Sequence, residues 1–370
     1  MRILIHVEDP GAANWIAPLV GALGGHELHV VAEGAAHAYL ADRSISALDW
    51  PGKKSASALL DDIRPDAVIA GTAENLESRG LDLIDLARLR DIPSASPIDQ
   101  AANAAHRFRG RSDDPRRHAP DLLFLPDEDA ADAFRKLGFP ETSLAVTGNP
   151  HHARLAATVD ALTAADPAAL REGVAPGVGK RPLIVFLAEI GYVVNPEAED
   201  WEQNLSFAGR NGSAARAPRM FEELVDALDA QAMERFLVLR LHPKNTPEEF
   251  SDTADAVDLT SQGGDPLPLV FAADLVVGLS GSLLEEAHLM GKRCLSILPH
   301  PVERAWLQGL ESGAIPAATN REELRTMLPA ILKDPAPAPA SLRRDATNTM
   351  LAALNTLVGQ RAARRAWSAT

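Results

Sequence analysis

Short β-branched or aliphatic runs alternate with longer Ala/Leu-rich stretches along the whole chain. This alternation predicts βαβ units with parallel strands, and therefore an α/β fold. The runs that predict strands in the first half are residues 2–7, 28–31, 66–70, 122–125 and 144–146. Those in the second half are residues 183–187, 236–241, 256–259, 275–277 and 294–298.

The two groups of strands are separated by a segment that starts as a helix and ends rich in Pro and Gly. A chain of 370 residues also suits two α/β domains better than one core. We predict an N-terminal Rossmann-like domain over residues 1–152, a linker over 153–180 and a C-terminal Rossmann-like domain over 181–339. Their mostly parallel sheets are expected to face each other across a cleft. A final helix within residues 340–370 is a candidate to cross back onto the first domain.

Composition and charge narrow the class of protein. Hydrophobic residues make up 46% of the chain, yet no stretch approaches the roughly 20 apolar residues of a membrane span. The first residues, MRILIHVEDP, predict a strand rather than a signal peptide. The single cysteine, Cys294, excludes an internal disulfide. These features predict a soluble cytoplasmic protein, and the net charge of −15 argues against nucleic acid as a partner. They leave the oligomeric state open.

The most informative segment is residues 278–286, GLSGSLLEE, where a buried strand leads into a small-residue turn and then a helix starting at Leu283. The free amides and the helix dipole predict a phosphate site, with Gly281 permitting close approach. The residues expected to bind substrate there are Ser280, Gly281, Ser282, Glu285 and Glu286, the two acids lying in the first turn near ribose hydroxyls. The alternative is that Ser282 is simply the helix N-cap and the acids complement the dipole.

A second cluster, LRLHPKN at residues 239–245, ends another predicted strand. Pro243 stops the strand, so His242, Lys244 and Asn245 are expected at the carboxyl edge of a parallel sheet, where α/β folds bind ligands. Such donors suit a phosphate leaving group whose negative charge grows during reaction.

The third cluster, VEDPGAANW at residues 7–15, follows the first strand. It leaves Glu8 and Asp9 at the sheet edge as candidate general bases, provided that burial moves a carboxyl pKa toward neutrality. Gly11 and Asn14 are candidate substrate contacts. The alternative is that Asp9 only caps the following helix.

Two irregular segments, residues 106–120 and 190–218, are long enough to be lids or plain mobile loops. No Walker loop, GxSxG elbow or HExxH motif is present, and His151 and His152 lack metal partners at ligand spacing. We therefore predict neither a metal nor a cofactor, with a nucleotide-sugar as co-substrate.

The two halves, the TGNP turn at residues 147–150, the HPKN turn and GLSGSLLEEAHLMGK together resemble the GT-B superfamily of nucleotide-sugar glycosyltransferases. The His-Pro and Ser pairing is similar to bacterial sialyltransferases and CDP-glycerol polymerases, in which those motifs hold the donor phosphate. The resemblance implies that His242, Ser280 and Ser282 lie at phosphate and that Glu285 or Glu286 lies at ribose.

The resulting hypothesis is a metal-independent glycosyltransferase that moves a sugar-like group from a nucleotide donor to a small-molecule or lipid-linked acceptor. Asp9 or Glu8 would be the base, and His242 would stabilise the leaving phosphate. Two alternatives remain. Non-hydrolysing UDP-N-acetylglucosamine 2-epimerases share the fold and a similar small turn with paired acids, and the chain could also be a catalytically inactive nucleotide-binding module. The sequence does not specify the nucleobase, sugar, acceptor or stereochemical course.

Overall fold

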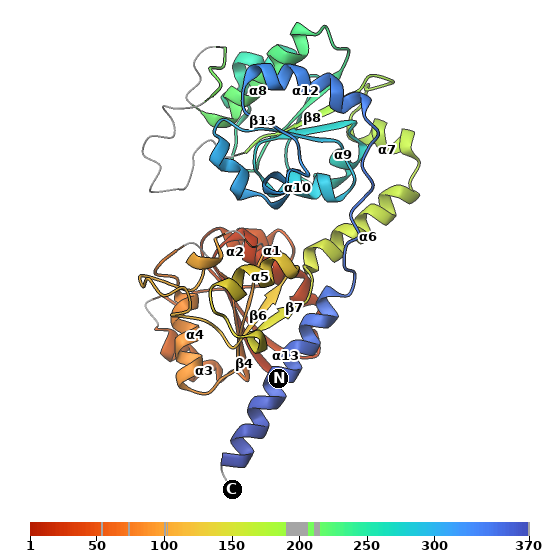
Figure 1. Ribbon diagram of the computed structural model, residues 1–370. Helices are drawn as coiled ribbons and strands as arrows, with labels where there is room; N and C mark the ends of the chain where they lie inside the picture. The colour runs from red at the N-terminus through yellow and green to blue at the C-terminus, as the bar shows by residue number, and fades with distance from the viewer. Residues whose placement is uncertain are drawn as a thin grey trace. The chain divides into compact units, whose positions relative to one another are not determined.

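A computed structural model describes residues 1–52, 55–72, 75–99, 101, 103–189, 206–210 and 215–368. The chain forms two compact units, here called the first unit (Met1–Arg154 with Arg343–Thr370) and the second unit (Leu155–Leu342). Helix α6 (Pro150–Ala164) runs through the boundary between them (Figure 1). Most of the segment at 190–218, for which the sequence leaves a lid and a plain loop open, lies outside the described residues.

The first unit is built on a seven-stranded parallel sheet of order β3-β2-β1-β4-β5-β6-β7. Its strands are β1 (Arg2–Val7), β2 (Glu27–Ala32), β3 (Leu48–Asp49), β4 (Ala67–Ala70), β5 (Ser94–Pro97), β6 (Leu122–Leu125) and β7 (Leu144–Val146). The strand order reverses between β1 and β4. In open parallel sheets this reversal creates a ligand crevice at the carboxyl ends of the strands.

Helices cover both faces of this sheet. They are α1 (Pro10–Ala22), α2 (Gly34–Ala41), α3 (Ala56–Ile63), α4 (Arg79–Leu89), α5 (Glu128–Lys136) and α13 (Ala346–Ser368), with the 3₁₀ turns η1 (Ala104–His106) and η2 (Glu141–Ser143). The core that includes Trp15 and Ile16 of α1 also takes in Met350 and Leu354 of α13. The final helix therefore completes the first unit.

The second unit repeats the design with a six-stranded parallel sheet of order β10-β9-β8-β11-β12-β13. Its strands are β8 (Leu183–Leu187), β9 (Phe236–Arg240), β10 (Leu259–Ser261), β11 (Leu275–Gly278), β12 (Cys294–Ile297) and β13 (Ala317–Ala318). Here the order reverses between β8 and β11. A ligand crevice is therefore expected at the carboxyl ends of these two strands.

The helices of the second unit again form two layers. They are α7 (Pro167–Val174), α8 (Arg216–Ala230), α9 (Leu267–Ala272), α10 (Ser282–Leu289), α11 (Gln308–Glu311) and α12 (Arg321–Lys333), with the 3₁₀ segments η4 (Pro247–Ala256) and η5 (Pro301–Trp306). Helices α8 and α12 pack on one face of the sheet, whereas α9 and α10 pack on the other (Figure 1). Strands β8, β11 and β12 are buried along their whole length, and burial on both faces explains the apolar runs in the sequence.

Nine of the predicted strands are found with ends that differ by no more than one residue. The prediction for residues 256–259 is wrong in its first part, because a capping box formed by Thr246 and Glu249 starts the η4 segment, which extends to Ala256. Strand β5 was missed because its sequence, SASP, has no β-branched or large apolar residue. The two-residue strands β3 and β13 are too short to give a pattern.

The described helices include none with the length and apolar character needed to cross a bilayer. The longest, α13, is fixed by its charged side chains. Arg361 pairs with Asp91 at 2.6 Å and with Asp121 at 2.5 Å, and Arg365 pairs with Asp91 at 2.8 Å. The basic end of this helix therefore binds acids of the same unit.

Candidate functional site

Polar residues in the second unit gather where three neighbouring strands end. Glu189 follows β8, His242 follows β9, and Ser280 follows β11. Since β9, β8 and β11 are adjacent and parallel, their carboxyl ends meet at one edge of the sheet. The side chains thus surround the point where the strand order reverses, which is where this class of sheet binds ligands.

The turn after β11 is an anion site, as expected from the sequence, but a carboxylate of the chain itself occupies it. Oε1 of Glu189 accepts hydrogen bonds from the amides of Leu279 at 3.1 Å, Ser280 at 2.9 Å and Gly281 at 2.7 Å. Three converging N–H groups just before a helix are a strong environment for negative charge.

Arg216, the first residue of α8, ties this carboxylate to the rest of the unit. Its Nη1 donates to Oε2 of Glu189 at 3.1 Å, and its Nη2 donates to Oγ of Ser280 at 2.9 Å. It also pairs with Glu303, which is fully buried, and its guanidinium lies 5.8 Å from the ring centroid of Trp306. Although burial opposes the charge, Glu189 and Glu303 raise the pKa of Arg216, so it remains a cation.

His242 presents a neutral donor at this edge. Its Nδ1 accepts the backbone N–H of Lys244 at 3.1 Å, which leaves the proton of the neutral imidazole on Nε2. Burial lowers the pKa of His242, and the charge of Lys244 lowers it further, while Glu189 opposes both. At neutral pH the His242 ring is therefore uncharged and offers its Nε2–H as a hydrogen-bond donor.

The other predicted residues of the second unit are distributed differently. Lys244 is exposed, whereas Asn245 is buried and closes its own turn, accepting from the amide of His242 and donating to Glu249. Oε2 of Glu285 accepts the amide of Gly309 at 2.9 Å, and burial raises the pKa of its carboxyl. Glu285 is thus engaged within the unit's own packing.

The start of α10 corrects two expectations. The helix begins at Ser282 rather than at Leu283, and its N-cap is Gly281, so the interpretation of Ser282 as an N-cap is wrong. The backbone of Gly281 is extended and sits against the Glu189 carboxylate, which leaves no room at the cap for a side chain. Of the paired acids, Glu285 lies in the first turn and Glu286 lies beyond it. Ribose contacts for these two acids stay a prediction.

The first unit has a comparable cluster at its own reversal point, centred on Asp9. This residue follows β1, and its Oδ1 caps α1 by accepting the amide of Ala12 at 2.8 Å. Burial raises the pKa of Asp9 to about 6, with the amide of Ala12 opposing the shift and the charge of Asp99 adding to it. Asp9 is therefore the N-cap of α1, and the same carboxyl has a pKa of about 6.

The neighbouring strands supply the rest of this cluster. Arg107 pairs with Asp99, which follows β5, at 2.6 Å and donates to Oγ1 of Thr72, which follows β4, at 2.9 Å. The irregular segment at residues 106–120 is thus anchored to the sheet edge by the arginine near its start. A Cβ on Gly11 would lie 3.0 Å from Oδ2 of Asp99, so a side chain there would push that carboxylate back by a few tenths of an ångström.

The remaining predicted residues of the first unit have partners within it. Glu8 accepts a hydrogen bond from Asn75 through Oε1 at 2.6 Å, while its buried Oε2 has no hydrogen-bond partner among the residues that the structure describes. Asn14 accepts the hydroxyl of Tyr39. The candidate base Asp9 is the one whose carboxyl also caps α1.

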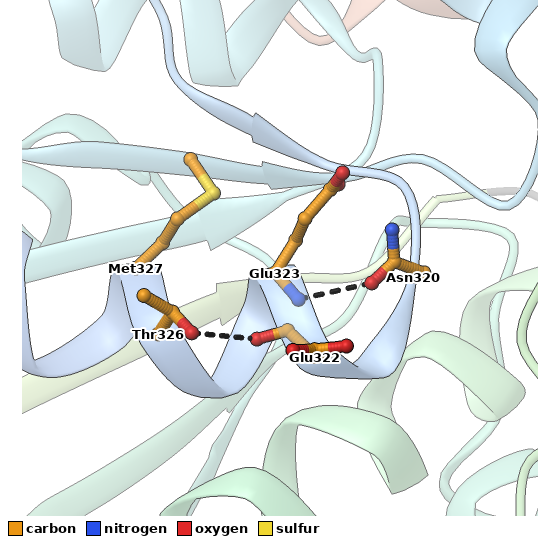
Figure 2. Close-up of a pocket in the computed structure, with 5 residues that line it drawn as sticks. All are labelled: Asn320, Glu322, Glu323, Thr326 and Met327. Carbon is orange, nitrogen blue, oxygen red and sulfur yellow. Dashed lines mark hydrogen bonds between the residues drawn. The ribbon is translucent and has the colours of Figure 1, made fainter.

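A surface hollow lies outside both clusters (Figure 2). It is lined by Asn320, Glu322, Glu323, Thr326 and Met327 on and just before α12. Its hydrogen bonds are those of a helix start, since Asn320 Oδ1 accepts the amide of Glu323 at 3.0 Å. It contains none of the predicted site residues. In the described part of the chain, no three His, Cys, Asp or Glu side chains are grouped to hold a metal ion.

The sequence analysis missed Glu189, Arg216, Glu303, Asp99 and Arg107. Glu189 had a usable signal, because it stands two residues after a continuous apolar strand, much as Glu8 and Asp9 stand after β1. Nothing in the sequence marks Arg216 or Glu303 as buried, since charged residues are expected at the surface.

Two Rossmann-like α/β units with parallel sheets define the GT-B architecture, so the fold predicted from the sequence is confirmed. Solved structures that resemble the chain include UDP-GlcNAc 2-epimerases and a rhamnosyltransferase. No family model matches the sequence, and no curated protein matches it either.

Several of these structures are UDP-GlcNAc 2-epimerases. UDP-GlcNAc 2-epimerase from Neisseria meningitidis, bound to UDP-GlcNAc, aligns with a TM-score of 0.65 and 15% identity over 96% of this chain and 100% of its own. The UDP-GlcNAc 2-epimerase from Methanocaldococcus jannaschii aligns with a TM-score of 0.65 and 14% identity, again over 96% of this chain and 100% of its own. The spinosyn rhamnosyltransferase SpnG, complexed with thymidine diphosphate, aligns with a TM-score of 0.56 and 15% identity over 98% of this chain and 96% of its own. At these identities the similarity establishes the fold.

Proposed function

We propose that the protein is an enzyme that acts on a nucleotide-activated sugar, and that it transfers the glycosyl group to the hydroxyl of an acceptor. The observation that carries this proposal is the Asp9 carboxyl, with its pKa of about 6 at the reversal point of the first sheet. A general base works best when its pKa is close to the working pH. This carboxyl meets that requirement, and it does so beside a second acid, Asp99, and a half-buried arginine, Arg107.

In the proposed reaction, Asp9 takes the proton of the acceptor hydroxyl as its oxygen forms a bond to the anomeric carbon. The bond between that carbon and the donor phosphate oxygen breaks, and its electron pair leaves with the nucleotide. Such a direct displacement inverts the anomeric centre. Burial sets the raised pKa of Asp9, and the charges of Asp99 and Arg107 adjust it, because Asp99 raises that pKa further and Arg107 lowers it.

The second unit would hold the leaving phosphate. Its candidates are the Nε2–H of His242, the ammonium of Lys244, and the amides and hydroxyl of the turn at Ser280. Donors of this kind stabilise the charge that develops on a departing phosphate without a metal ion. The thymidine diphosphate complex of SpnG supports a nucleotide ligand for this fold.

Epimerisation is the second candidate. It is supported by the similarity to UDP-GlcNAc 2-epimerases, which is at least as close as that to the rhamnosyltransferase. The grouping of Glu8, Asp9 and Asp99 near one another also fits it, since inverting a C–H centre needs one group to remove a proton and another to return it.

The two reactions separate in one assay. The protein is incubated in D₂O with UDP-GlcNAc and with other nucleotide-sugars, with and without a mixture of small-molecule and lipid-extract acceptors, and followed by NMR. Glycosyl transfer is expected to release nucleotide only when acceptor is present. Epimerisation would place deuterium at C2 and change its configuration without acceptor, and consumption of no nucleotide-sugar would refute both.

A further inference from the structure

The anion site of the second unit is already filled by the protein itself. Glu189 accepts all three amides of the turn at residues 279–281 through a single oxygen, Oε1. Its other oxygen accepts from Arg216, whose second donor reaches the hydroxyl of Ser280. A bound phosphate would need these same amides, so the carboxylate and the phosphate compete for one place.

The turn is shaped around this carboxylate. A Cβ on Gly281 would lie 2.9 Å from Oε1 of Glu189 and 3.1 Å from its carboxyl carbon. The backbone of Gly281 has φ −82° and ψ 152°, which any residue can adopt. Glycine is therefore needed for the approach of Glu189 and not for the conformation of the turn.

The local charge also disfavours an incoming anion. Glu189 and Glu303 both contact the single guanidinium of Arg216, which leaves the group with one negative charge in excess when all three are ionised. Once the Glu189 carboxylate is gone, Glu303 is the carboxylate among the described residues that remains paired with Arg216 beside the three amides. The arginine would then have a donor to offer to phosphate.

We infer that Glu189 is a built-in occupant of the phosphate site, whose carboxylate must leave the amides before a phosphate group of a nucleotide can bind there. The inference rests on the proposed function for its ligand class, a nucleoside diphosphate. It adds that the free protein holds this site closed with its own side chain. Affinity for phosphate is then set by competition with Glu189.

The test uses inorganic pyrophosphate as the probe, titrated calorimetrically into the full chain. Glu189→Ala is expected to bind pyrophosphate about tenfold more tightly than the unchanged protein or better, because a like charge at the site is removed. Glu189→Gln is expected to show a smaller gain, because its amide oxygen can still accept the N–H groups. Glu322→Gln, which removes an exposed carboxylate from α12 of the same unit, is the matched control and should change nothing.

A second measurement covers the case in which Glu189→Ala folds poorly. Gly281→Ala should lower the denaturation midpoint of the unchanged protein, because its Cβ presses on the carboxylate. The same substitution should have less effect in the Glu189→Gln background, where the displaced group carries no charge for the amides to hold. An equal effect in both backgrounds would show that the contact does not hold the site closed.

The outcomes separate this inference from the proposed function. Pyrophosphate binding that is no tighter in Glu189→Ala and Glu189→Gln than in the unchanged protein overturns the inference, even if nucleotides bind. Tighter pyrophosphate binding in the variants supports it, and if no nucleotide-sugar is bound or consumed in the same experiments, the proposed function alone fails.

Discussion

Replacing Asp9 by Asn is expected to lower turnover by about 10²- to 10⁴-fold while leaving nucleotide affinity unchanged, because a general base contributes on that scale. The amide has nearly the same shape and is also a good N-cap, so α1 should still begin at Pro10. With the unchanged protein, the rate should rise with pH through about 6, since Asp9 must be ionised to accept a proton. The check is kcat and nucleotide Kd measured for both proteins between pH 5 and pH 8, a range chosen to bracket that pKa.

Stability provides the control for this substitution. The pKa of Asp9 rises from 3.8 to about 6 on folding, so its favourable contribution is full below pH 3.8 and is lost as the pH rises through 6. Asn does not titrate, and Asp9→Asn should therefore gain stability relative to the unchanged protein over this window, by up to about 3 kcal/mol. If Asp9→Asn keeps full turnover, Asp9 is not the general base, whatever its effect on stability.

Replacing Arg216 by Met is expected to cost the second unit about 3 kcal/mol of unfolding free energy or more, because it strands buried acids without their cation. Glu303 is fully buried, and Arg216 is its partner in an ion pair. Glu189 would keep its three amides but lose its contact with the guanidinium. Chemical denaturation of the full chain measures the effect.

Two further variants define the origin of that cost. Arg325→Met, an exposed arginine on α12, is the matched control and should change the free energy by no more than about 0.5 kcal/mol. Adding Glu303→Gln to Arg216→Met should recover part of the loss, because the stranded charge is then removed. If Arg216→Met is as harmless as the control, the buried network has no energetic importance.

The fold could be predicted from the sequence because buried parallel strands leave continuous apolar runs. Leu183–Leu187 reads LIVFL and needs no context, whereas Ser94–Pro97 reads SASP and is a strand only because its neighbours on both sides pair with it. Missing that strand also hid Asp99, the acid whose charge adds to the rise that burial causes in the pKa of Asp9. Tertiary pairing, rather than local preference, determines such elements.

The residues of the candidate site divide in the same way, into those that a local sequence pattern marks and those that only tertiary packing brings together. Asp9, His242 and Ser280 could be proposed from the sequence because each is a polar residue at the end of a predicted strand. A phosphate at the turn after β11 stays a prediction, and the carboxylate that contacts its amides could not be foreseen, since no local pattern links Glu189 to the amide of Ser280, 91 residues away. Arg216 was hidden for a similar reason, because its burial arises only when α8 packs beside η5.

The most direct test of the central claim is a thermal-shift panel of UDP, CDP, CMP, GDP and dTDP, free and linked to sugars, on the full chain and on His242→Ala. A ligand at 100 times its dissociation constant adds about 2.7 kcal/mol of stability, which such a scan resolves. Binding of a nucleotide-sugar predicts that one nucleotide family raises the melting temperature and that His242→Ala reduces this gain. If none of these nucleotides raises it, the protein does not bind an activated sugar, and the proposed function is wrong.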